Sequence, residues 1–363
     1  MKLVAFYLPQ FHEIPENNDT WGKGFTEWTN VRKAHALYLG HYQPRVPLHN
    51  NYYDLLDVQV MEWQDRLARK AGIYGFCFYH YWFQGRMVLE KPVENWLNDK
   101  KITTHFCFAW ANEPWTKTWH GAGGNKEILI SQTYGGQEEW RQHYDYFRSF
   151  FIDTRYIKVQ NKPMLLIYKL KNIPHYNRMI SFWNECAQQD GFNGVYIVSM
   201  NTDHGHMGNS KFVHASVDFE PNRTKYKFLL EDTLEVEPKE KSIFWNRYAM
   251  RTLNYDAINR KMLKDSHKKD HFRTAFIGYD DTPRRNLRGL ITVGESPHKF
   301  EKYLKKIIQL SIQEGNEFVF INAWNEWGEG NYLEPDMRYQ YAYLRAVKNC
   351  ISNNNSPRQT RKG

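Results

Sequence analysis

Apolar runs alternate with amphipathic stretches along most of the chain. In the last run every residue from Phe318 to Ile321 is apolar, which is typical of a strand buried on both faces. We predict eight strands of this kind, at Lys2–Pro9, Tyr74–Trp82, Thr104–Asn112, Pro163–Leu170, Gly194–Asn201, Ala215–Pro221, Phe272–Asp281 and Glu317–Glu326.

Helical spacing of apolar residues appears between most of these strands. Before the second strand, Val58, Met61, Leu67 and Ala71 fall on one face of a helix. The repeated strand–helix order predicts one α/β domain, a single (β/α)8 TIM barrel over residues 1–350. A doubly wound open sheet is the alternative, but no glycine-rich phosphate loop follows the first strand. The predicted helices are Asp57–Ala71, Glu138–Phe151, Asn177–Gln189, His298–Gln313 and Asp336–Cys350.

Three segments interrupt this order. Residues 11–51 are long, weakly periodic and rich in aromatic side chains, and we expect them to form a flap over the barrel mouth. Residues 222–271 are charged and partly helical, which predicts an insertion after the sixth strand. Residues 351–363 form a polar C-terminal tail.

Aromatic content adds a functional expectation. Of the 363 residues, 16% are aromatic, with 13 Trp and 24 Tyr, although the hydrophobic content is an ordinary 41%. An aromatic-rich core explains part of this. Indole and phenol rings also offer flat apolar faces with a polar handle, which suits stacking against sugars.

The formal net charge of +9 would suit a nucleic-acid partner. The sequence has no nucleic-acid motif, however, and Lys and Glu are mixed along the predicted helices, so we expect no nucleic acid. The same positive charge would also suit weaker attraction to an anionic membrane surface or to a lipid-phosphate-linked sugar.

The first apolar segment, Leu3–Leu8, is short and has no cleavage site after it, so we interpret it as a strand and not a signal peptide. No run approaches the ~20 apolar residues of a membrane span. Four Cys without paired spacing indicate neither disulfides nor a zinc site, and we expect a cytoplasmic protein. They are Cys77, Cys107, Cys186 and Cys350.

The strongest candidate chemistry lies at the end of the eighth strand. Glu326 and Glu329 are three residues apart, with Trp327 and Gly328 between them. Two Glu at this spacing can simply cap a helix. Two carboxyls that follow a buried strand beside indole rings instead favour cleavage or transfer of a sugar, because one carboxyl protonates the leaving oxygen and the other assists the nucleophile.

Other polar and aromatic residues gather at the predicted strand ends and in the flap. The active site of a (β/α)8 barrel lies at the carboxyl ends of its strands, so these residues predict one polar cleft. We expect the substrate-binding residues to be Tyr7, Gln10, Trp28, His80, Tyr81, Trp82, Trp110, Asn112, Glu113, Asp203, Asn325, Trp327, Tyr332 and Glu334.

Five further residues are weaker candidates: His204, His206, Asp280, Arg284 and Arg285. The two His at alternate positions have a spacing that metal ligands also use, but a single His-Gly-His is more often explained by loop hydrogen bonding. We therefore predict no metal and no cofactor.

Two families resemble this sequence. Asn325–Gly330 followed by Leu333–Pro335 resembles the catalytic motif of glycoside hydrolase family 99, which comprises endo-acting α-mannosidases and α-mannanases on a (β/α)8 barrel. The chain as a whole is still more similar to the WbsX-type proteins of bacterial surface-polysaccharide clusters, often labelled glycosyltransferases. Pro114 is a small departure from the pattern. The matching segments are Phe6–His12, Trp21–Trp28, Gly40–Pro44, Tyr74–Phe76, Trp110–Glu113 and Asp281–Arg285.

The family 99 resemblance implies a retaining mechanism without an enzyme-bound sugar ester. Glu326 would take the proton of the substrate 2-hydroxyl, whose oxygen attacks C1 to give a 1,2-anhydro sugar. Glu329 would protonate the leaving oxygen and later activate water, and Glu113 would hydrogen-bond the substrate. This assignment requires Glu329 to be protonated at rest, so we expect its pKa to be raised by burial beside Trp327 or by its acidic neighbour.

Three functions remain open. The first is a glycosidase or transglycosidase acting on an α-linked, mannose-like oligosaccharide or lipid-linked glycan. The second is a glycosyltransferase that builds O-antigen, lipopolysaccharide or capsule. The third is an inactive glycan-binding protein. The sequence contains neither an Asp-x-Asp nor a G-x-G-x-x-G motif, which favours the first over the second. The intact carboxylate pair disfavours the third.

Overall fold

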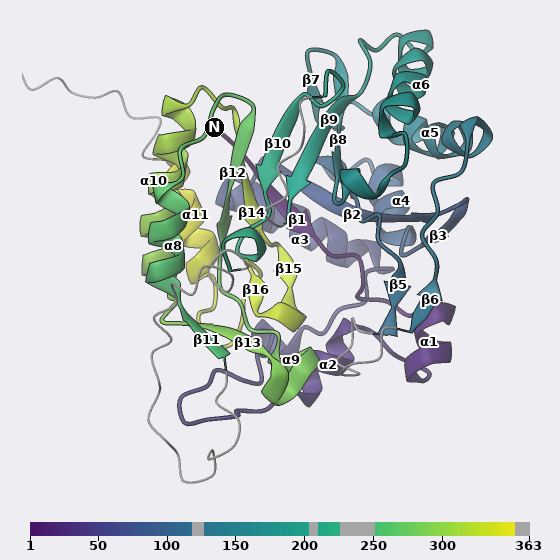
Figure 1. The fold of residues 1–363 in the computed structure, drawn as a ribbon. Helices are drawn as coiled ribbons and strands as arrows, with labels where there is room; N and C mark the ends of the chain where they lie inside the picture. Colours follow the sequence, from purple (N-terminus) through teal and green to yellow (C-terminus); the bar gives the residue numbers. More distant parts are fainter. Residues whose placement is uncertain (118–126, 203–209, 226–250, 353–363) are drawn as a thin grey trace, which may run out of the picture.

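The computed structural model describes residues 1–117, 127–202, 210–225 and 251–352. Eight parallel strands close into a barrel, because the first strand pairs both with the second and with the last (Figure 1). In barrel order these are β1 (Lys2–Tyr7), β2 (Gly75–Phe83), β4 (His105–Trp110), β8 (Lys162–Ile167), β9 (Tyr196–Asn201), β10 (Ala215–Asp218), β12 (His271–Phe276) and β14 (Phe318–Asn322). The predicted barrel and its eight strands are confirmed.

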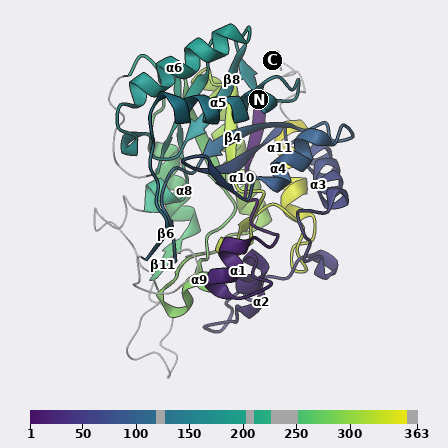
Figure 2. The same cartoon turned by 90° about the vertical axis from the view of Figure 1, so that its right-hand side faces the viewer.

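Helices surround this barrel in both ribbon views (Figures 1 and 2). Four of the five predicted helices begin within one residue of their expected position. The described helices around the strands are α3 (Val58–Ala71), α4 (Lys91–Asn98), α5 (Gln137–Phe151), α6 (Tyr176–Gln189), α8 (Tyr255–Lys264), α10 (Pro297–Gln313) and α11 (Ala342–Ser352).

Local sequence signals explain where these helices start and stop. The Asp57 carboxylate accepts a hydrogen bond from the Gln59 backbone N–H at the start of α3, and Gly72 ends that helix in a left-handed conformation. Ser296 caps α10, with Pro297 at its first position. The predicted helix from Asp336 was wrong at its start, because the Asp336 carboxylate instead accepts hydrogen bonds from the Tyr42 and Tyr332 hydroxyls.

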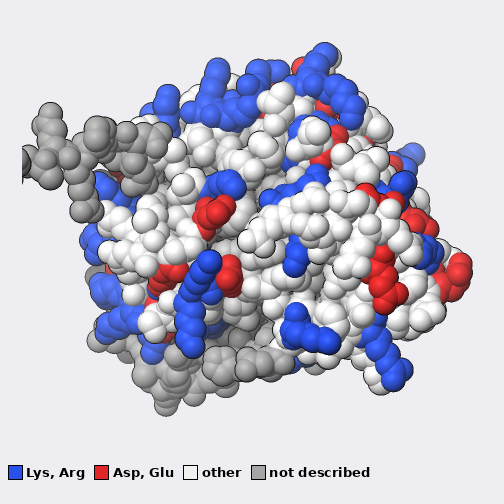
Figure 3. Space-filling model, turned by 90° about the horizontal axis from the view of Figure 1, so that it is seen from above, with Lys and Arg blue, Asp and Glu red and all other residues white. Residues whose placement is uncertain are grey.

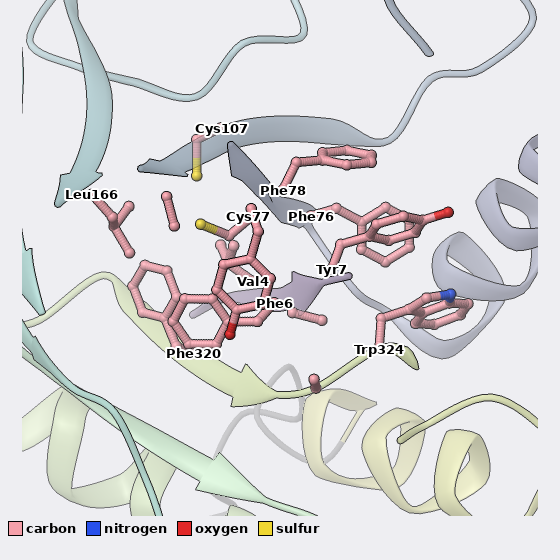
Figure 4. Close-up of a cluster of buried hydrophobic side chains, with 14 of the residues drawn as sticks. Val4, Phe6, Tyr7, Phe76, Cys77, Phe78, Cys107, Leu166, Phe320 and Trp324 are labelled. Carbon is pink, nitrogen blue, oxygen red and sulfur yellow. The ribbon is translucent and has the colours of Figure 1, made fainter. Parts of the chain in front are cut away.

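Side chains alternate between the barrel interior and the layer under the helices, as strand geometry requires. Phe6 and Phe320 stack inside the barrel with ring centroids 5.4 Å apart. Tyr7 points the other way and packs 4.4 Å from Phe78. Figure 4 shows these two groups, with Val4, Phe6, Cys77 and Phe320 on one side and Tyr7, Phe76, Phe78 and Trp324 on the other.

The predicted flap contains two short helices, α1 (Pro15–Trp21) and α2 (Glu27–Lys33), and α2 contacts the loop that follows the eighth strand. Within the predicted insertion, β11 (Arg251–Asn254) pairs in parallel with β13 (Leu290–Val293) and leads into α8. Residues 226–250 and most of the predicted tail lie outside the described residues.

Charge is dispersed on the end of the barrel where the strands begin. Figure 3 views the molecule from this end, and Lys and Arg side chains are more widespread there than Asp and Glu. The opposite end carries the loops that follow the strands, including α2 and the hairpin of β15 and β16 described below (Figure 1). Among the described residues, no helix combines the length and the apolar character needed to cross a membrane.

Candidate active site

One pocket, which encloses about 580 Å³ when the open solvent at its mouth is included, lies at the carboxyl ends of the barrel strands. It lies where the active site of a (β/α)8 barrel is expected. Five strands, or the loops that follow them, contribute to its wall, which combines aromatic rings with three carboxyls. The lining residues are Tyr79, Tyr81, Ala111, Glu113, Pro114, Trp115, Tyr168, Phe219, Asn222, Glu326 and Glu329.

The alternation along β2 decides which of its aromatic residues reach this pocket. Tyr79 and Tyr81 line it. His80 and Trp82 point to the opposite face, where the His80 Nε2 lies 2.9 Å from the His143 Nε2 and the Trp82 ring stacks on the same His143 ring. The expectation that His80 and Trp82 line the cleft was therefore wrong, because it ignored the two-residue period of a strand.

The two candidate carboxyls lie on a tight hairpin after β14. It consists of β15 (Asn325–Glu326), a 3₁₀ turn at Trp327–Glu329, and β16 (Asn331–Tyr332), which pairs antiparallel with β15. A Cβ atom on Gly328 would lie 1.8 Å from the Glu27 Oε1, so only glycine fits between the two Glu.

A buried hydrogen-bond network holds this hairpin from behind. The Asn325 side chain bonds both the N–H and the C=O of Leu8. The Trp327 Nε1 donates to the Glu334 Oε2 at 2.7 Å, and the Trp327 ring stacks on Tyr332 at 3.7 Å. Asn325, Trp327, Tyr332 and Glu334 thus do not line the pocket, and we reassign them from substrate contact to support of the hairpin.

Glu334 is the centre of that network. Its carboxylate also accepts hydrogen bonds from the Tyr53 hydroxyl and the Gln64 amide. Burial raises the pKa of Glu334 to about 7, although its hydrogen bonds from Trp327 and Gln64 act in the opposite direction.

Four other predicted contacts are also placed away from the pocket. The Tyr7 hydroxyl donates to Gln64, and the Trp28 Nε1 donates to the Tyr53 carbonyl. Trp110 packs against Trp183 under the helices, and the Asn112 side chain bonds the Lys169 backbone. These corrections have the same cause, since each residue faces outward or closes a loop. Gln10 is buried and does not line the pocket, and Asp203, His204 and His206 lie outside the described residues.

One cation joins the two candidate carboxyls. Arg284 belongs to the short helix α9 (Thr282–Arg285), and its NH1 lies 2.8 Å from the Glu329 Oε1. Its NH2 lies 3.4 Å from the Glu326 Oε2, and its Nε donates to the Glu27 Oε1 at 2.9 Å. Arg284 had been only a weaker candidate from the sequence.

Within this pair, the structure supports a raised pKa for Glu326. Burial, with the charge of Glu329 as a second cause, raises the pKa of Glu326 to about 8 against the opposing effect of Arg284. The Glu329 side chain is more exposed, at 22%, and makes the shorter contact with Arg284. Near neutral pH this shift favours the protonated form of Glu326 in the unliganded site.

Several lining residues were missed from the sequence. Tyr79 is at an inward position of β2 and Tyr168 directly follows the end of β8, and extending the two-residue alternation along both strands would have found them. Phe219 and Asn222 follow β10, and Trp115 begins the two-residue strand β5 after β4, so these residues stand in short segments that carry too few residues for a periodic signal. Glu27, fully buried beneath the hairpin, had no signal beyond an acidic residue in an aromatic flap.

Asp218, His267 and His271 form a cluster of side chains of the types that bind metal ions. The His267 Nε2 lies 2.7 Å and the His271 Nε2 lies 2.8 Å from the Asp218 carboxylate. These are hydrogen-bond lengths, shorter than the ~3.3 Å between ligands of a tetrahedral zinc. Arg223 also lies 3.3 Å from Asp218, and its charge would repel a metal ion. These residues fit a hydrogen-bonded ion cluster and do not fit a metal site.

The fold is shared with known glycan-processing proteins. It is similar to that of the GH99 endo-alpha-mannosidase from Bacteroides thetaiotaomicron, with a TM-score of 0.56 and 13% identity over 97% of this chain and 96% of that one. A solved glycoside hydrolase-like protein gives a TM-score of 0.56 and 14% identity over 96% and 93% of the two chains. At these identities the likeness establishes the fold alone.

Sequence relatives are closer. Residues 3–347 match the family described as Glycosyltransferase WbsX. The uncharacterized protein WxcX of Xanthomonas campestris pv. campestris, found in two strains, is 34% identical over 355 residues, which are 96% of this chain and 49% of the relative. The chain thus spans about half the length of the curated relatives it matches.

A closed barrel with a carboxylate pair at its mouth, together with these similarities, supports a carbohydrate-active enzyme. The chain belongs to the WbsX glycosyltransferase family.

Replacing Gly328 with alanine tests the packing under the hairpin. The new Cβ would overlap the Glu27 carboxylate, which is fixed by Arg284. We expect Gly328→Ala to lower the free energy of unfolding by about 1–3 kcal/mol, as overpacking does. Gly136→Ala is the control, since its Cβ would meet nothing within 4 Å. Equal urea midpoints for both variants would contradict the close packing of Glu27 beneath Gly328.

Proposed function

We propose that this protein is a retaining glycosidase or transglycosidase that acts on an α-linked, mannose-like glycan. The supporting observation is that Glu326 and Glu329 open into the same aromatic-walled pocket and contact the same guanidinium. A structural pair of carboxyls would have no reason to face a solvent-accessible pocket.

The pocket wall suits a sugar ring. Tyr79, Tyr81, Trp115 and Tyr168 present ring surfaces with polar handles, which match the C–H faces and hydroxyls of a pyranose. The carboxylate of Glu113 lies on the same wall and would accept hydrogen bonds from sugar hydroxyls.

In the proposed reaction Glu326 takes the proton of the 2-hydroxyl while O2 forms a bond to C1. The bond from C1 to the leaving oxygen breaks, and Glu329 gives that oxygen its proton. Glu329 then takes a proton from water or from an acceptor hydroxyl, whose oxygen attacks C1. The C1–O2 bond opens and the proton on Glu326 returns to O2. The configuration at C1 is retained, in a substrate-assisted variant of two-carboxylate catalysis.

This cycle requires the pair to carry one proton, with Glu329 as its holder when the reaction starts. In the unliganded site the protonated form of Glu326 is favoured near neutral pH, because burial raises its pKa to about 8. Binding of a sugar would move the proton to Glu329, because a hydrogen bond donated by the 2-hydroxyl stabilises the ionised form of Glu326 more than its protonated form.

The second candidate is a glycosyltransferase of O-antigen, lipopolysaccharide or capsule synthesis, which the family description favours. A lipid-linked glycan is a suitable substrate for either activity, and the excess of basic residues would assist peripheral contact with an anionic membrane. Transglycosylation would reconcile the hydrolase-like site with a biosynthetic role, because it passes sugar between glycans without a nucleotide donor. An inactive glycan-binding protein is less favoured, since binding alone needs no paired carboxyls.

Parallel incubations distinguish these functions. With α-mannan or bacterial O-polysaccharide we expect new reducing ends or altered chain lengths, and with nucleotide sugars we expect no nucleotide release. Glu326→Gln and Glu329→Gln should each lower kcat by at least about 10²-fold. Glu317→Gln is the control, because its 71% exposed side chain lies at the start of the eighth strand. Nucleotide release dependent on wild-type protein would instead support the transferase.

The pH dependence of kcat/KM tests whether the pair Glu326 and Glu329 must carry one proton. Above pH of about 8 the pair loses it, as the raised pKa of Glu326 implies, so kcat/KM should fall about tenfold per pH unit. An aryl glycoside whose leaving group needs no protonation should not show this alkaline decline. An equal decline for both substrates would contradict the acid role of Glu329.

A further inference from the structure

Arg284 connects three separate segments of the chain. Its three guanidinium nitrogens each contact a different carboxylate, from Glu27 in the flap and from Glu326 and Glu329 on the hairpin. The Arg284 side chain is only 7% exposed, so these contacts are made with little water to screen them.

The position of Arg284 is fixed by the start of α9. The Asp280 Oδ1 accepts hydrogen bonds from both the N–H and the hydroxyl of Thr282, and its Oδ2 lies 2.9 Å from the His41 Nε2 and accepts a bond from the Gln43 amide. The flap therefore anchors α9 on one side, and Arg284 extends from it toward the pocket.

Glu27 occupies the third side of the guanidinium. It is fully buried under Gly328, and its Oε2 makes no hydrogen bond among the described residues. A carboxylate at such a site is costly unless a cation accompanies it. Arg284 is that cation, and Glu27 in turn prevents the guanidinium from turning fully toward the catalytic pair.

An ordinary structural ion pair would explain Glu27 and Arg284 alone. It would not explain why the two remaining nitrogens of Arg284 point at both carboxyls that line the pocket. The shared contact keeps two carboxyls at one site, where repulsion would separate them whenever both are ionised.

We propose that Arg284, held in place by Glu27, is a positioning residue that keeps Glu326 and Glu329 together with one shared proton and lets that proton pass from Glu326 to Glu329 when substrate binds. This role rests on the proposed function. The guanidinium contacts both Glu326, which gives the proton, and Glu329, which receives it. It therefore stabilises the negative charge on whichever carboxyl is ionised. The proton only changes carboxyl, and no group is oxidised or lost.

The role of the cation can be measured without activity. Without Arg284 the pKa values of the buried carboxyls should rise further above their values in the unfolded chain than they do in wild type. The free energy of unfolding of Arg284→Met should therefore fall more steeply than that of wild type as pH rises from 5 to 9. Arg288→Met removes an equal charge from an exposed position nearby and should run parallel to wild type. Glu27→Gln added to Arg284→Met should recover part of the slope. Parallel curves for Arg284→Met and wild type would overturn the inference.

Kinetics then test the catalytic consequence. Arg284→Met should lower kcat at least 100-fold and move the pH optimum upward by a unit or more, whereas Arg284→Lys should recover part of kcat. A normal pH profile with only reduced thermal stability would assign Arg284 a purely structural role and overturn the proposal.

If Arg284→Met does not fold, Glu27→Gln replaces it, with a changed pH optimum expected. Absence of wild-type activity on every glycan would instead reject the proposed function, while the unfolding curves still decide whether Arg284 holds the carboxyls.

Discussion

The meeting of three carboxylates with one guanidinium is the interaction on which the rest of the site depends. Glu27 lies about 300 residues before the hairpin that carries Glu326 and Glu329, and Arg284 comes from a third segment. No short segment could assemble such a cluster, because like charges at this density repel unless a rigid frame holds their counter-charge among them. The closed barrel supplies that frame.

Each part of the frame has a recognisable task. The barrel brings the ends of eight strands to one rim. In the flap, α2 packs beneath the hairpin, and His41 bonds Asp280 at the start of α9. The Glu334 network fixes Trp327 from behind, so the hairpin is supported without any residue of that network lining the pocket. The many aromatic residues of the sequence lie partly in these supporting layers and partly in the pocket wall.

The sequence was sufficient to predict the barrel, because continuous apolar runs and amphipathic helices carry strong local signals. It also identified Glu326, Glu329, Glu113 and Tyr81, all of which line the pocket. The sequence-based prediction failed for His80, Trp82 and Trp110, because the two-residue alternation of a strand places these side chains on the outer face of the barrel. Glu27 could not be predicted, since its proximity to Gly328 exists only after the flap folds across the barrel. The site of the raised pKa was likewise a property of three-dimensional burial and not of spacing.

Membership of the WbsX family and a fold shared with an endo-alpha-mannosidase lead to two different descriptions of one site. Under the proposed function, the pair of carboxyls on a single cation would serve both descriptions with the same chemistry, and water or a sugar hydroxyl would be the acceptor. The most direct test is a crystal structure of Glu329→Gln with an α-linked mannose disaccharide. We expect the 2-hydroxyl within hydrogen-bonding distance of Glu326 and the glycosidic oxygen beside residue 329. A sugar bound elsewhere, or bound here with its 2-hydroxyl turned away from Glu326, would contradict the account.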